Sequence, residues 1–141
     1  MIFIGGNMSI YEKLEKIDKL KQHKRKVDQL KEIKDTITLS LIQGCYAKSN
    51  VLKMPEGEPP GIEFKEDGPA LQKKHFMKLL QSMEMSRHQW ERERIYTELL
   101  NEVNEGDAKI LLCVKDRNLE TLFPTFTKEL MKEAFPNLKI K

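Results

Sequence analysis

A run of prolines and glycines near the middle of the chain most constrains how it can fold. Residues 55–61 read Pro-Glu-Gly-Glu-Pro-Pro-Gly. Proline lacks an amide donor and fixes φ, so this run excludes a helix. We therefore expect a loop over residues 50–69 that divides two helical halves. Within it, Ile62-Glu63-Phe64 alternates and predicts at most a very short extended piece.

Before this loop, apolar residues recur at helical spacing. Ser9 and Glu12 have the spacing of a capping box, which predicts a first helix that begins at Ser9. The apolar stripe is interrupted over residues 22–26 and resumes at Val27, which indicates two short helices or one bent helix. A further helix is expected near residues 36–46.

After the loop, the pattern is again helical. Gly68-Pro69 predicts the start of a helix over about 70–84, with its apolar face formed by Phe76, Leu79, Leu80 and Met83. Ser86 and Gln89 have capping-box spacing and predict a helix to about residue 103.

The remaining helices are expected over residues 108–116, capped by Asp107, and from Thr125 or Thr127 to a point before Pro136. We thus predict an all-α fold with five to six helices, in one domain over residues 9–141. Residues 1–8 are expected to be a flexible N-terminal extension.

Composition excludes several classes of protein. The 25 basic and 22 acidic residues give a net charge of +3, a milder excess than strong nucleic-acid binders carry. The longest strongly apolar run, Ile110–Val114, is far shorter than the roughly 20 residues of a membrane span. Residues 1–7 lack the basic start of a signal peptide. We expect a cytoplasmic protein without membrane contact.

No pattern in the sequence indicates catalysis, a metal or a cofactor. Cys45 and Cys113 are far apart, which predicts two buried, reduced thiols without zinc spacing. The histidines His23, His75 and His88 form no known catalytic or metal motif, and each is predicted to be a solvated helix side chain. Gly5-Gly6 lacks the features of a phosphate-binding loop. We therefore predict a protein that is not an enzyme.

One candidate binding surface is the basic run Lys19, Lys21, Lys24, Arg25 and Lys26. Five cations close together can contact the phosphates of a nucleic acid. No aromatic residue interleaves them, which weakens an interpretation as a single-strand binding site. A solvated helix face, with acidic residues nearby, is the alternative interpretation.

A second candidate is Trp90, which points about 140° away from the apolar stripe of its expected helix at about 100° per residue. It shares its side with Arg87, Arg94 and Asn101. Tryptophan with flanking arginine is typical of a protein-interface anchor. The alternative is that an adjacent helix covers Trp90, and the pattern favours this alternative slightly.

The third candidate is the loop itself, with Pro55, Glu56, Gly57, Pro59 and Pro60. A rigid, acidic, proline-rich loop can present an extended ligand to a partner. It can equally be a stiff connector between the two helical halves, which is the interpretation we prefer.

Three segments together resemble an uncharacterised family of small proteins from large contractile-tailed phages, especially marine and cyanobacterial ones. They are Leu52–Pro60, Asp107–Asp116 and Thr127–Pro136, and with the helices between them they span roughly residues 30–139. The chain departs from the family at Gly61, where an aromatic residue is usual, and over Asn118–Pro124, where the family has a shorter stretch.

The resemblance implies a phage origin and a helical fold, but no activity or catalytic residue. The hypothesis that follows is a non-enzymatic accessory or adaptor protein that binds a phage or host protein in the cytoplasm of an infected bacterium. Two alternatives stay open: an accessory nucleic-acid-binding protein that uses residues 19–26, and a minor component of the virion.

Overall fold

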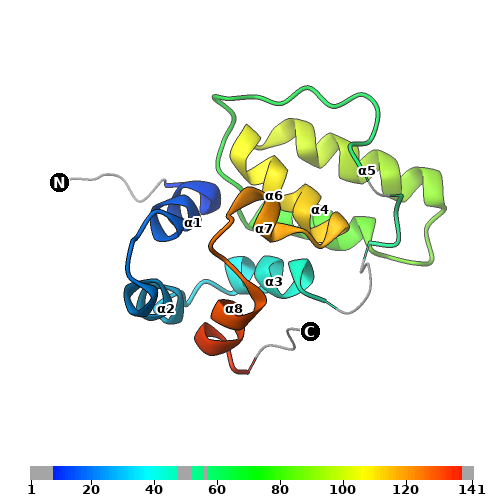
Figure 1. The fold of residues 1–141 in the computed structure, drawn as a ribbon. Coiled ribbons are helices and arrows are strands. Elements are labelled where there is room, and N and C mark those ends of the chain that lie inside the picture. The colour runs from blue at the N-terminus through cyan, green and yellow to red at the C-terminus, as the bar shows by residue number, and fades with distance from the viewer. Residues whose placement is uncertain (1–7, 48–51, 56, 138–141) are drawn as a thin grey trace.

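The computed structural model describes residues 8–47, 52–55 and 57–137, and these residues form eight helices and no strand (Figure 1). The helices are α1 (Ile10–Asp18), α2 (His23–Lys31), α3 (Thr36–Cys45), α4 (Lys73–Ser82), α5 (Gln89–Glu102), α6 (Glu105–Asp116), α7 (Leu119–Leu122) and α8 (Lys128–Ala134). The all-α prediction is therefore confirmed, but the number of helices is higher than the predicted five to six.

Helix α6 is the centre of the fold. It contacts α1, α3, α5 and α7, while α2 packs against α1 and α8. The long loop leaves α3, crosses above α5 and returns towards α1 before α4 begins (Figure 1). Helices α4 and α5 then run antiparallel as a hairpin on one side of α6 (Figure 1).

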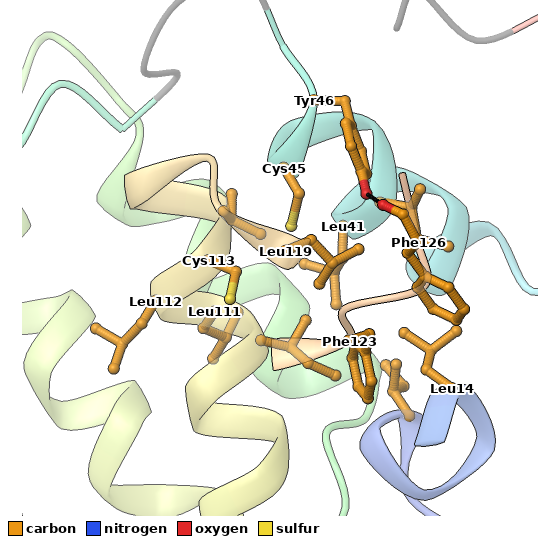
Figure 2. Close-up of a cluster of buried hydrophobic side chains, with 14 of the residues drawn as sticks. Leu14, Leu41, Cys45, Tyr46, Leu111, Leu112, Cys113, Leu119, Phe123 and Phe126 are labelled. Carbon is orange, nitrogen blue, oxygen red and sulfur yellow. Dashed lines mark hydrogen bonds between the residues drawn. The ribbon is translucent and has the colours of Figure 1, made fainter. Parts of the chain in front are cut away.

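The core lies where α1, α3 and α6 meet the chain around α7 (Figure 2). Leu14, Leu41 and Leu111 reach it from the three helices, and Phe123 and Phe126 fill the space beside them. The Tyr46 hydroxyl donates to the Phe126 carbonyl over 2.6 Å, which satisfies both groups in the core (Figure 2). Ile110–Val114, the apolar run of the sequence, is buried throughout.

The start of the first helix is as predicted. The Ser9 side chain accepts from the Glu12 amide and the Glu12 carboxylate accepts from the Ser9 amide, which forms the capping box. Two helices, α1 and α2, form here, but the break between them lies at residues 19–22, and residues 23–26 of the predicted interruption belong to α2. Met8 is described but the rest of the predicted N-terminal extension lies outside the described residues.

Three predicted helix starts are wrong. Helix α4 begins at Lys73 rather than at Pro69, because Pro69 and Leu71 bond to the α5–α6 junction instead of turning into a helix. Helix α5 begins at Gln89 after His88, without the predicted capping box. Helix α6 begins at Glu105, because the Asn104 side chain caps it in place of Asp107.

Helix α7 was not expected, because a four-residue helix is too short to show a periodic pattern. Among the helices that the structure describes, none combines the length and hydropathy that a membrane span requires.

Candidate protein-interaction surface

Large apolar side chains that the core leaves uncovered gather on the α4–α5 hairpin. Of the five such side chains in the described residues, four lie between positions 77 and 90: Met77 (49% exposed), Leu80 (41%), Met85 (59%) and Trp90 (65%). Exposed apolar side chains that adjoin one another mark interaction sites, and these four fall in one stretch of the chain. We call residues 85–90, which complete the connection between the two helices and begin α5, the hairpin tip.

Trp90 is the most exposed large apolar side chain in the described chain. No neighbouring helix covers it, so the alternative that the sequence pattern favoured is wrong. Its indole ring lies parallel to the ring of His88, with 6.4 Å between centroids and 10° between planes. The tip thus presents two flat rings and Met85 to solvent.

The arginines beside Trp90 are paired within the hairpin. Arg87 donates to Glu84 over 3.1 Å and to Glu91 over 3.2 Å, and Arg94 donates to Glu98 over 2.9 Å. The two Arg87 pairs link the connection between the helices to the first turn of α5, and all three pairs balance the charge around the tip. The surface is therefore apolar with a balanced polar border, as interface centres tend to be.

Buried polar contacts fix the helix that carries Trp90. Arg92, two residues after Trp90, is buried and donates to the Leu52 carbonyl over 3.0 Å. The buried Tyr96 hydroxyl donates to the Leu111 carbonyl of α6 over 2.7 Å. Because α5 is tied to the loop and to α6, Trp90 stands on a rigid base, which lowers the entropic cost of binding.

The proline-rich loop is bonded along its length to α5 and α6. Lys115, whose side chain is only 1% exposed, donates to the carbonyls of Pro55 (2.8 Å) and Gly57 (2.7 Å) and to Asp116. The Gly57 amide donates to Asp116 in return, and Asn101 bonds to Gly61 and Glu63. These contacts support the connector interpretation over that of a presented ligand.

The loop nevertheless has an exposed outer side. Pro55, Gly57 and Pro60 are exposed and Pro59 is half-buried, while Glu56 lies outside the described residues. The cavity between the loop and α5 measures about 110 Å³, well below the roughly 300 Å³ of a typical ligand pocket. The loop offers a surface for contact but no pocket.

The basic run lies where α1 ends and α2 begins. Lys19, Lys21, Lys24 and Arg25 are exposed, but Lys26 is only 8% exposed and does not join them. Residues 8–35 hold nine basic and six acidic residues, whereas the rest of the chain holds sixteen of each. The whole net charge of the protein therefore arises in this segment.

Helix α2 has an unusual first turn. Lys24 and Arg25 place positive charge at the positive end of the helix dipole, and the turn contains no acidic residue. Gln22, at the N-cap, makes no capping hydrogen bond with its side chain. A bound anion would compensate both features.

The three histidines lie in different environments. His23 bonds to Glu133 over 2.9 Å and His88 is exposed, but His75 is buried, so its predicted exposure is wrong. The His75 Nδ1 accepts a hydrogen bond from the backbone amide of Gln72. Burial, with the nearby charge of Lys74, lowers the pKa of His75.

Cys45 and Cys113 are free thiols within one buried cluster (Figure 2). Burial raises the pKa of Cys45 well above its ordinary value and that of Cys113 to about 12. Both thiols stay protonated at neutral pH and are poor nucleophiles. Within the described residues, no three His, Cys, Asp or Glu side chains are grouped so that they can hold a metal ion.

The sequence pattern missed part of the hairpin surface. Of the apolar face predicted for this helix, Leu79 is buried and Phe76 and Met83 are half-buried, but Leu80 is exposed. The apolar residues of α4 extend over more of its circumference than one packed face requires, and this excess was the available signal. Lys115 was missed because a lysine among charged residues gives no sign of burial.

Comparisons with protein-family models, with curated proteins and with solved structures find no match to this chain.

Proposed function

We propose that this protein works as a non-enzymatic interaction protein and binds another protein through its hairpin tip. The observation that carries the proposal is the 65% exposure of Trp90 on a helix that buried contacts fix in place. Tryptophan is among the residues that contribute most to protein interfaces. The ring of His88 lies parallel to it and extends the flat surface, and Met85 is exposed on the same connection.

The setting of this interaction rests on the sequence resemblance to a phage family. On that basis the partner is a phage or host protein met in the cytoplasm of an infected bacterium. Incorporation into the virion is the alternative setting, and it is tested by looking for the protein in purified particles.

The experiment is capture of partners by the immobilised protein from an extract of infected cells, followed by mass spectrometry. Three forms are compared: the wild type, Trp90→Ala and the double variant Lys24→Ala/Arg25→Ala. We expect a protein that the wild type and the double variant capture and that Trp90→Ala loses. Because the Trp90 side chain is mostly exposed, the variant should keep its helical circular-dichroism spectrum and its unfolding midpoint. Equal capture by Trp90→Ala would refute the proposal.

The basic segment supports a second candidate function, nucleic-acid binding. Its support is the uncapped start of α2 with exposed cations at Lys21, Lys24 and Arg25. Phosphate contacts predict binding that weakens steeply as salt increases and shows little sequence preference. Lys26 is left unchanged in the test, because its burial makes a substitution there a change of packing.

For this candidate, Lys21→Ala/Lys24→Ala/Arg25→Ala should abolish retention on immobilised DNA and RNA at low salt. Trp90→Ala serves as the matched control and should retain the nucleic acid fully. Undiminished retention by the triple variant would exclude this function.

A further inference from the structure

The exposed side of α4 carries a ridge of four residues with opposite charges at its two ends. Lys73, Met77, Leu80 and Glu84 are spaced four, three and four residues apart. At about 100° per residue Lys73, Met77 and Leu80 fall within roughly 60° of one another around the helix axis. Glu84 lies two residues past the end of α4, where its amide donates to the Gln81 carbonyl three residues back in a tighter turn, and it forms the C-terminal end of the ridge. All four side chains are exposed.

The core does not include Met77 and Leu80, the apolar residues at the centre of this ridge. Helix α4 buries His75, Leu79 and Ser82, which lie on its other side. Met77 and Leu80 therefore keep 49% and 41% of their surface exposed, and neither belongs to the core cluster. Phe76 is half-buried and packs against the core.

The ridge of one copy is complementary to the ridge of a second copy when the two α4 helices run antiparallel. A two-fold axis midway between Met77 and Leu80 brings Met77 of one copy opposite Leu80 of the other. The same rotation brings Lys73 opposite Glu84, because each lies four residues outside the apolar pair. A parallel arrangement would instead place Lys73 beside Lys73 and Glu84 beside Glu84.

The charged groups at the ends are able to form these pairs. Lys73 makes no ion pair within the part of the chain that the structure describes. Glu84 accepts from Arg87 through Oε2 only, which leaves Oε1 for a second donor. Each of the two symmetry-related pairs would thus join a cation and an anion at the border of the apolar strip.

We infer that the occupant of this ridge is a second copy of the chain, with α4 packed antiparallel against its symmetry mate in a two-fold dimer. Contact through one helix of each copy buries less than the roughly 1,200 Å² of a standard stable interface. The dimer is therefore weak, and it forms at high protein concentration. Trp90 lies outside the ridge, so each dimer would carry two hairpin tips and bind a multivalent partner with added avidity.

The test is sedimentation equilibrium of the purified chain over a wide concentration range. We expect the wild type to dimerise and both Lys73→Glu and Glu84→Lys to raise the dissociation constant by about fivefold to tenfold, because two ion pairs become repulsive. An equimolar mixture of the two variants should recover wild-type dimerisation, since each face of the mixed dimer regains opposite charges. The double variant Lys73→Glu/Glu84→Lys should recover it as well.

Two controls separate this dimer from a change in folding or net charge. Lys73→Glu places an acid in the first turn of α4, which the helix dipole favours, so this variant should fold normally. Lys128→Glu makes the same charge change in the exposed first turn of α8 and should leave the dissociation constant unchanged.

A wild type that stays monomeric at every concentration, or variants that fail to rescue each other on mixing, would overturn the inference. Trp90→Ala should dimerise as the wild type does, so failure of the proposed partner binding and failure of this dimer give different results.

Discussion

At the scale of single residues, buried polar groups hold together segments that are distant in sequence. Asp107 is buried and its carboxylate accepts from the Tyr11 amide at 2.9 Å and from the Leu71 amide at 2.8 Å. It thereby joins the start of α1 and the end of the loop to α6. The sequence pattern assigned Asp107 a local capping role, because spacing along the chain shows nothing of partners 36 or 96 residues away.

Asp107→Asn tests this role. The amide keeps one acceptor oxygen but turns a donor towards the second backbone amide, which leaves a buried amide unpaired. We expect the free energy of unfolding to fall by about 2–3 kcal/mol, measured by urea denaturation. Asp28→Asn, at an exposed position, is the control and should cost little. A similar loss in both variants would contradict the role.

His75 makes stability depend on pH. Because its pKa in the folded protein lies below the ordinary value of 6.5, the unfolded chain takes up the proton first as pH falls. This contribution to stability is complete above about pH 7, and it is lost as pH falls from there towards the folded pKa. His75→Asn keeps an acceptor for the Gln72 amide but does not titrate. We expect urea denaturation to show a smaller loss of stability from pH 7.5 to 5.5 in this variant, whereas equal losses would exclude His75 as the cause.

At the scale of elements, the amino-acid composition of the loop predicts its conformation only in part. Its prolines and glycines establish that residues 55–61 are not helical, and the described residues of that run agree. Composition does not show that hydrogen bonds fix the loop in place. These bonds come from Lys115, Arg92 and Asn101, which lie on helices far along the chain. The predicted start of α4 was wrong for the same reason, since Pro69 and Leu71 are held by long-range bonds.

Lys115→Met should release the loop. Three hydrogen bonds are lost while the apolar stem is kept, so we expect a loss of about 2–3 kcal/mol in stability. Amide exchange at Gly57 should accelerate more than exchange in α6, because the bonds to the loop are lost first. Lys109→Met is the matched control on α6, since the Lys109 side chain is half-exposed and pairs with Glu105. If amide exchange in the loop were unchanged, Lys115 would not be the group that holds it.

At the scale of the whole molecule, the structure separates three surfaces on one helical body. The hairpin tip is apolar, the α4 ridge is apolar with charged ends, and the start of α2 is basic. From the sequence, Trp90 and the basic run were identified as candidate contacts. The ridge was not, because Leu80 was assigned to a core that the structure fills with other residues.

The role of the hairpin tip in binding is tested most directly at Trp90, which is the chain's single tryptophan. Protein labelled with 5-fluorotryptophan gives one ¹⁹F resonance, and its shift between H₂O and D₂O reports contact with solvent. We expect a strong solvent shift in the free protein. When the partner that the wild-type protein captured is added, the resonance should move and its solvent shift should become smaller. A resonance that the bound partner leaves unchanged would contradict the claim that the hairpin tip is the binding surface.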